Sequence, residues 1–170
     1  GGNPGMQLRT LAVHGIVDRI HDGTREVLLQ QRDDNHRWEP PAGVVDSGEN
    51  PIAACAREVW EETALRVEVR SLAAVFVDLN GIRIPAARVE PVNLIYRCRA
   101  VDPWAALRPQ PGESIDVAWV PVARLAEWVT VEAMRARIHC GLSAWSHVPT
   151  VCHDGTRVLS GLLTEAPLAA

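Results

Sequence analysis

The chain has 170 residues, of which 47% are hydrophobic, and its formal net charge is −4. This length predicts one domain with enough chain to bury a core, and the negative charge argues against a basic face for duplex nucleic acid. The absence of a membrane-length apolar run and of a signal-peptide pattern predicts no membrane partner and a cytoplasmic location. The four cysteines lack CxxC spacing, which favours reduced thiols. Residues 1–5, GGNPG, are typical of an expression-tag remnant.

Alternating apolar residues and turn signals predict most of the secondary structure in chain order. We expect strands over 10–18 and 26–31, joined by a hairpin turn at Asp22-Gly23. After a helix at 51–63, the pattern predicts one or two strands over 66–79 and strands over 92–100 and 115–120. Helices are expected over 122–128 and 131–142. The string HDGTR, which surrounds the first turn, recurs at 153–157 and predicts a second hairpin turn there. Residues 143–170 are therefore expected to form a C-terminal extension, a hairpin that packs on the same domain.

The helix over 51–63 carries the clearest local signals. Asn50 can accept hydrogen bonds from free N–H groups, and Pro51 needs no donor at the first helical position. The following segment lacks glycine and is rich in alanine and glutamate, which favours helix. One face, predicted to point toward the core, has the spacing of an apolar stripe and consists of Ile52, Ala56, Val59 and Thr63.

Three acids gather on another face of this helix. Glu58, Glu61 and Glu62 stand at i, i+3 and i+4, so their carboxylates converge and repel one another. Oxygen ligands without nearby His or Cys suit Mg²⁺ or Mn²⁺ rather than zinc. The alternative is a solvated acidic helix face, which is common for paired glutamates.

Residues 43–65 have a longer pattern, in which Gly43, Glu49, Arg57 and the three acids follow the spacing G-x5-E-x7-R-E-U-x-E-E with U apolar. This resembles the Nudix box. The resemblance implies an α/β Nudix fold, with a mixed β-sheet sandwiched between α-helices, over residues 6–142. The chain departs from the family pattern at Ala64, where the family has glycine. A left-handed residue at that helix end would cost alanine roughly 1 kcal/mol relative to glycine.

From the resemblance comes a reaction, the Mg²⁺-dependent hydrolysis of a diphosphate within a nucleoside diphosphate linked to another group. It implies that Glu58, Glu61 and Glu62 ligate the metal, with Mn²⁺ as a substitute, and that the backbone carbonyl of Ala42 adds a ligand. Glu58 or another acid would serve as the general base. Arg57 would hold Glu49, which ties the loop to the helix. A distant acid completes the site, and Glu113 in the PGES loop is the first candidate for it. Asp116 is the second, and the alternative for Glu113 is a solvated loop residue.

The linked group of the substrate stays open among ADP-ribose, a sugar nucleotide and a nucleoside triphosphate. Arg32, Arg83 and Arg88 are candidate phosphate or sugar contacts, against the alternative of surface arginines. The side chains that could stack on a base or line the pocket are Trp38, Trp104 and His36. Trp119 is expected in the core, and Trp60 in a packing or homodimer contact. A Nudix-like regulatory domain that binds a nucleotide without cleaving it is the alternative function; the retained box acids favour catalysis.

Overall fold

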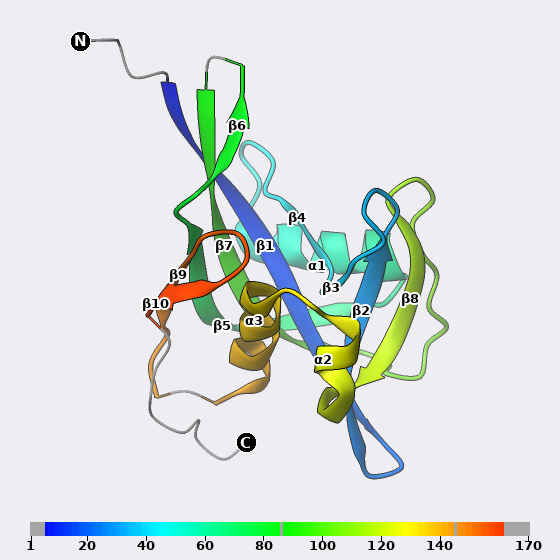
Figure 1. The fold of residues 1–170 in the computed structure, drawn as a ribbon. Helices are drawn as coiled ribbons and strands as arrows, with labels where there is room; N and C mark the ends of the chain where they lie inside the picture. Colours follow the sequence, from blue (N-terminus) through cyan, green and yellow to red (C-terminus); the bar gives the residue numbers. More distant parts are fainter. Residues whose placement is uncertain (1–5, 86, 145, 162–170) are drawn as a thin grey trace, which may run out of the picture.

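The computed structural model describes residues 6–85, 87–144 and 146–161 (Figure 1). The predicted tag remnant and the end of the extension, residues 162–170, lie outside the described residues. The strands are β1 (Met6–His21), β2 (Thr24–Arg32), β3 (Trp38–Glu39), β4 (Ala42–Val44), β5 (Val67–Asp78), β6 (Ile82–Ile84), β7 (Ala87–Ala100), β8 (Ser114–Pro121), β9 (Thr150–His153) and β10 (Val158–Ser160). The helices are α1 (Pro51–Thr63), the 3₁₀ turn η1 (Val122–Arg124), α2 (Leu125–Trp128) and α3 (Glu132–Leu142).

The strands form one mixed sheet in the order β10-β9-β5-β7-β1-β2-β3, with β4 paired to β1, β6 to β7 and β8 to β2. The pairs β1–β7 and β5–β9 are parallel, and the other pairs are antiparallel. Strand β1 joins the two halves of the sheet, because its residues 6–17 pair with β7 and its residues 18–21 pair with β2.

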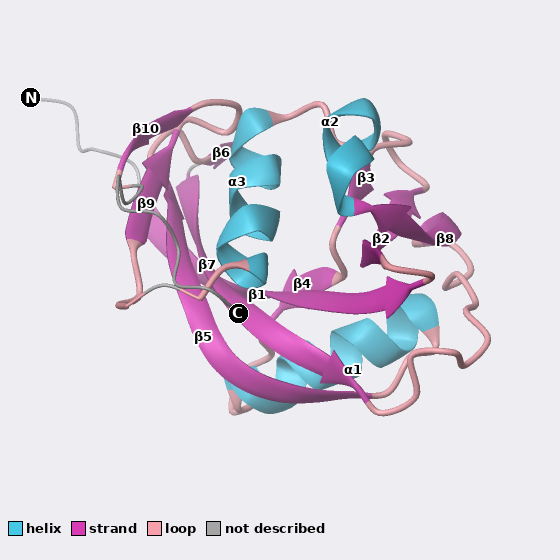
Figure 2. Cartoon of the chain, turned by 90° about the horizontal axis from the view of Figure 1, so that it is seen from below, coloured by secondary structure: helices cyan, strands magenta, loops and turns pink. Residues whose placement is uncertain are grey.

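Helices cover both faces of this sheet, as Figure 2 shows, with α1 on one side of β1 and α2 and α3 on the other. Side chains alternate between the faces of a strand, so Val13 and Val17 of β1 pack with α1, while Ile16 packs with α3. The two buried clusters lie on opposite faces of the sheet, and the α/β fold with a sheet between helices is confirmed. None of the helices in the described ranges is long and apolar enough to span a bilayer.

The structure differs from the predicted elements in three short strands and one helix. Strands β3, β4 and β6 were not predicted, because two or three residues are too few to show a period. The predicted helix over 122–128 is a 3₁₀ turn followed by a single helical turn. The tight turn at Asp22-Gly23 is confirmed, with φ of 49° and 77° at its two residues.

The C-terminal hairpin extends the sheet. Strands β9 and β10 are antiparallel on either side of the second HDGTR string, and β9 lies parallel to β5. The turn between them contacts α3, since the backbone N–H of Ala133 donates to the carbonyl of Thr156 at 2.9 Å. The hairpin therefore reaches the same face of the sheet as α2 and α3.

Candidate active site at helix α1

Helix α1 begins and ends where the sequence predicts. The Asn50 side chain accepts from the N–H of Ile52 at 2.8 Å, and Pro51 is the first helical residue. The helix ends at Ala64, which is left-handed with φ 61° and ψ 18° and donates its N–H to the Trp60 carbonyl. The predicted apolar stripe is confirmed at Val59 and Thr63, but Ile52 is 51% exposed and Ala56 is only partly buried. The buried face of the helix consists of Ala54, Cys55, Val59, Glu62 and Thr63.

Beside this helix lies a polar cavity of about 290 Å³, which we call the glutamate cavity. It brings together α1, β4, the end of β2 and the loop before β8. Its lining residues are Gln30, Arg32, Ala42, Gly43, Glu58, Glu61, Glu62, Gln110 and Glu113. The sequence singled out all of these except Gln30 and Gln110. Gln30 had a signal in the sequence, since it is the polar residue that follows the apolar run of β2.

Gly43 allows Glu58 to lie against the backbone of β4. A Cβ atom on Gly43 would stand 2.1 Å from Cδ of Glu58 and 2.2 Å from its Oε1, far inside van der Waals contact. The side chain of Glu58 is 14% exposed. Burial is the main cause that raises the pKa of Glu58, and the Arg57 guanidinium opposes this shift. The glycine of the box thus keeps space for a carboxylate.

Glu62 is the most buried of the three acids, at 7% exposure. Its Oε2 accepts from Nε2 of Gln30 at 2.5 Å and from the backbone N–H of Ala42 at 3.1 Å. Burial, followed by the nearby Glu58 charge, holds the pKa of Glu62 well above its usual value, although the Ala42 hydrogen bond opposes the shift. Burial disfavours the charged form of a carboxyl group, and at Glu62 this effect outweighs the Ala42 hydrogen bond.

Arg57 is the cation among these acids. It donates to both carboxylate oxygens of Glu49, at 2.8 and 2.9 Å, and its Nη1 reaches Glu58 at 2.8 Å and Glu61 at 3.2 Å. The bidentate contact ties the loop before α1 to the helix. One guanidinium therefore donates hydrogen bonds to three carboxylates and lies 3.7 Å from a fourth, that of Asp46, while Glu62 is not among its contacts in the described residues.

The donor set fits a hard divalent cation. The cavity offers carboxylate and backbone oxygens without His or Cys, which are the ligands that Mg²⁺ prefers. Within the described ranges, no three His, Cys, Asp or Glu side chains form a complete metal-binding group. The carboxylates that would bind a cation are hydrogen-bonded to other side chains instead. Glu58 and Glu61 accept from Arg57, and Glu62 accepts from Gln30.

A short turn positions Glu113 across the cavity from α1. The N–H groups of Glu113 and Ser114 donate to the Gln110 carbonyl, and Gly112 takes the left-handed φ of 81° that this turn requires. The carbonyl of Glu113 also accepts from the Asp33 N–H at 3.0 Å. The second candidate, Asp116, does not line the cavity, and its Oδ1 accepts from the N–H of Val117 instead.

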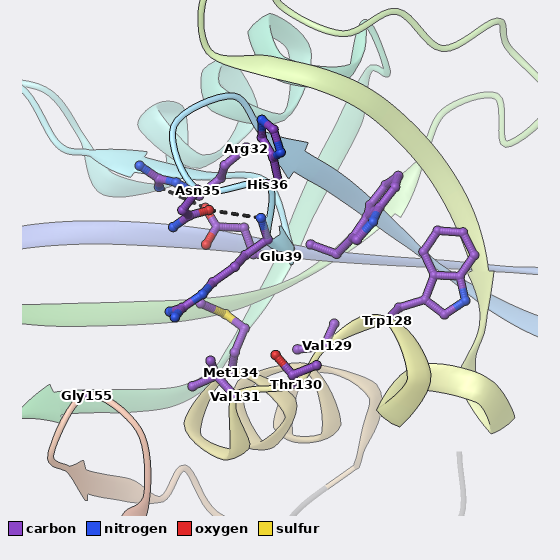
Figure 3. A pocket seen from close by; sticks show the side chains of 12 residues that line it. Arg32, Asn35, His36, Glu39, Trp128, Val129, Thr130, Val131, Met134 and Gly155 are labelled. Carbon is purple, nitrogen blue, oxygen red and sulfur yellow. Dashed lines mark hydrogen bonds and ion pairs between the residues drawn. The ribbon is translucent and has the colours of Figure 1, made fainter.

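A second cavity of about 250 Å³, which we call the tryptophan cavity, lies next to the first between β2–β3 and α2–α3 (Figure 3). Its lining residues are Arg32, Asn35, His36, Arg37, Trp38, Glu39, Trp128, Val129, Thr130, Val131, Met134 and Gly155. Arg32 lines both cavities and donates to Asp34 and to Glu39. The predicted residues Arg32, Trp38 and His36 therefore come together here.

Three other predicted contacts lie outside both cavities. Arg83 and Arg88 face each other in the register of β6 and β7, and Figure 1 shows that hairpin at the opposite end of the sheet from β3 and β8. Trp104 packs against Arg19 and His21. Of the remaining tryptophans, Trp119 packs partly buried against the core on the α1 face, and Trp60 is 39% exposed.

Comparison with known proteins agrees with this geometry. The sequence model of the NUDIX domain matches residues 9–139. A MutT-like protein of Streptomyces ambofaciens is 34% identical over 154 residues, covering 89% of this chain and 88% of that protein. The asymmetrical bis(5'-nucleosyl)-tetraphosphatase of Rattus norvegicus is 28% identical and covers 74% of this chain and 84% of its own length.

Among solved structures, the NUDIX domain of Shewanella oneidensis NrtR, complexed with ADP ribose, superposes with a TM-score of 0.61 at 21% identity. The superposition covers 81% of this chain and 87% of that one, and at this identity it shows the fold alone. The family match over most of the chain, the MutT-like relative and the six box residues agree with one another. The chain therefore belongs to the NUDIX domain family.

Proposed function

We propose that this chain is a Mg²⁺-dependent hydrolase that cleaves the diphosphate bond of a nucleoside diphosphate linked to another moiety, by attack of water on phosphorus. Relatives within the family include a bis(5'-nucleosyl)-tetraphosphatase and an RNA pyrophosphohydrolase, which supports a hydrolase of pyrophosphate bonds. The observation that carries the finer proposal is the glutamate cavity, in which four carboxylates from α1 and the 110–114 turn share one space.

The charge balance of the cavity supports a cation and a phosphate chain. Arg57 and Arg32 are already engaged by carboxylates, so Glu62 and Glu113 have no guanidinium partner of their own in the described residues. When bound there, Mg²⁺ would neutralise the charge of the diphosphate and lower the pKa of its bound water. The residues that would hold it are Glu58, Glu61, Glu62 and the carbonyl of Ala42.

The remaining residues bind and orient the substrate. Glu113 faces the α1 acids across the cavity and is the candidate to accept a proton from the attacking water. Among the described residues, three of the five N–H donors of Arg32 go to Asp34 and Glu39, which leaves two for a phosphate. Gly43 and Arg57 keep Glu58 and Glu49 in place.

The relatives support a nucleotide substrate without fixing the linked group. One relative is named as a dinucleoside tetraphosphatase, and one structural neighbour is complexed with ADP ribose. ADP-ribose, sugar nucleotides and nucleoside triphosphates therefore all stay in the proposal. A homodimer through the face that carries Trp60 also stays a prediction.

The test is turnover on a nucleotide panel. Purified protein with Mg²⁺ is expected to release a nucleoside monophosphate from at least one of ADP-ribose, a sugar nucleotide, a dinucleoside polyphosphate or a nucleoside triphosphate. Glu61→Gln should slow this reaction well over tenfold, more than about 1.4 kcal/mol. Glu68→Gln is the matched control, because Glu68 is an exposed acid of β5 that lines neither cavity.

A non-catalytic nucleotide-binding domain is the alternative. It predicts that the same panel yields calorimetric binding of a nucleotide but no product with Mg²⁺ or Mn²⁺. An unchanged rate in Glu61→Gln would instead show that the α1 acids are not the metal face.

A further inference from the structure

We propose that the tryptophan cavity binds the base of the substrate, and that Glu39 on its floor selects a base with two adjacent N–H donors, the edge that guanine presents. This inference rests on the proposed function, because it assigns the second half of the same substrate. It goes further by naming the side chain that reads the base.

The cavity has the composition of a site for a flat heterocycle. Trp38 and Trp128 meet edge to face, with ring centroids 4.8 Å apart, and Met134 and Val131 of the α3 region form the opposite wall (Figure 3). Aromatic and aliphatic walls beside polar groups that orient the ligand are typical of small-molecule sites, and here half of the lining residues are polar or charged. Asn35 and Thr130 add hydrogen-bonding groups at the edge.

Glu39 is a partly buried acid that lines this space. Its side chain is 12% exposed, and its Oε1 accepts from Nη1 of Arg32 at 3.0 Å. Among the residues that the structure describes, none donates a hydrogen bond to Oε2. In Figure 3 the residue lies between Arg32 and Asn35 on one side and Met134 on the other. An acceptor in this position is open to the cavity.

Two arginines set the charge of Glu39. Burial raises the pKa of Glu39, while Arg32 and the buried Arg137 both oppose this shift. Arg137 of α3 contacts Nε2 of His14 and of His153, at 3.3 and 3.0 Å, and no carboxylate lies within hydrogen-bond distance of it in the described ranges. Glu39 and Asp78 are the nearby anions that favour the charged form of the buried Arg137. The attraction is mutual, so Arg32 and Arg137 favour the ionised, acceptor-only form of Glu39 against the burial that raises its pKa.

The chemistry of a carboxylate then selects the base. Two carboxylate oxygens accept two parallel N–H donors, as in a bidentate pair with arginine. Guanine offers its ring N–H and its amino group side by side, whereas hypoxanthine lacks the amino group. A buried acceptor left unpaired discriminates strongly against the analogue that lacks the donor.

The connection to the glutamate cavity passes through Arg32, the residue that lines both spaces. A base in the tryptophan cavity would therefore direct its phosphates past this guanidinium toward α1. The far rim is formed by Gly155 of the C-terminal hairpin, which lies beyond the residues that match the family. This part of the site belongs to the chain's own extension.

The experiment measures binding without catalysis. In metal-free protein, calorimetry should give GMP at least about tenfold tighter affinity than IMP, the same nucleotide without the amino group. Glu39→Gln presents one acceptor in place of two and should reduce the difference to less than about twofold. Asp34→Asn is the matched control, since it also removes an ion pair from Arg32 but does not line the cavity, and it should keep the difference.

Equal affinities of wild-type protein for GMP and IMP, or no measurable binding of either, would overturn the proposal. So would a loss of discrimination in Asp34→Asn equal to that in Glu39→Gln, because the effect would then come from Arg32. The wild-type comparison needs no variant to fold. Discrimination between GMP and IMP without any turnover would refute the proposed hydrolysis and leave this inference standing.

Discussion

Replacing Gly43 with alanine is the sharpest test of how the glutamate cavity is built. The new Cβ would stand 2.1 Å from Cδ of Glu58, whereas non-bonded carbon atoms prefer about 3.5–4.0 Å. The carboxylate must therefore move by roughly 1.5 Å. Because a misplacement of about 1 Å can cost about a hundredfold in rate, we expect Gly43→Ala to lower kcat/KM by at least that factor, or about 2.7 kcal/mol.

The assay is the Mg²⁺-dependent release of nucleoside monophosphate, with metal affinity followed separately by titration calorimetry. Gly43 does not have a positive φ, so alanine meets no backbone strain there. Gly48→Ala is the matched control within the same box, since a Cβ at Gly48 meets nothing within 4 Å, although its φ of 77° adds a small strain. Wild-type turnover and metal affinity in Gly43→Ala would refute the assignment of Glu58 to the metal face.

Two further predictions concern stability. Ala64→Gly should raise the free energy of unfolding by about 1 kcal/mol with unchanged turnover, because Ala64 is left-handed at φ 61°; a lower urea midpoint would contradict this. Glu62→Gln should stabilise the protein in EDTA, and the gain should grow as pH rises. The pKa of Glu62 is higher in the folded than in the unfolded protein. Its contribution to the free energy of unfolding is therefore fully present below about pH 4.3, the unfolded pKa. Between that pH and the folded pKa the contribution falls by at most about 1.4 kcal/mol per pH unit. The pKa of the buried His14 is lowered to about 3 in the wild-type protein. Its effect on stability is expected to be the same in Glu62→Gln, so it cancels when the two free energies of unfolding are subtracted. A gain that is the same at pH 5 and pH 9 in urea unfolding would show that Glu62 is ionised in the folded protein.

Local sequence signals predicted α1 and its acids because they act within a few residues. The Asn50-Pro51 cap, the glutamates at i, i+3 and i+4, and the hairpin at Asp22-Gly23 depend only on neighbouring backbone. The long strands β2, β5, β7 and β8 showed their period in the same way. The short strands β3, β4 and β6 did not, because two or three residues are too few to show a period, and β4 is defined only by its pairing with the distant strand β1.

Among the candidate residues outside residues 43–65, the sequence placed some in the two cavities correctly and others wrongly. Glu113 reaches the glutamate cavity because β8 pairs with β2 and places the 110–114 turn beside Arg32. Arg83 and Arg88, like Glu113, lie in a segment that contains glycine and proline. The β6–β7 hairpin nevertheless holds the two arginines at the other end of the sheet. Composition and turn chemistry could not separate these outcomes, since strand order is a long-range property.

By itself, the sequence determined the box helix, its boundaries and the convergence of its acids, because helical geometry fixes which side chains share a face. Only the tertiary structure decided the environment of those acids. Burial beside Gln30 raises the pKa of Glu62, Arg57 donates hydrogen bonds to three carboxylates, and Arg32 lines both cavities. These features arise where α1 packs against β1 and β4 and where β8 pairs with β2. Contacts between elements distant in the chain have no local sequence signature.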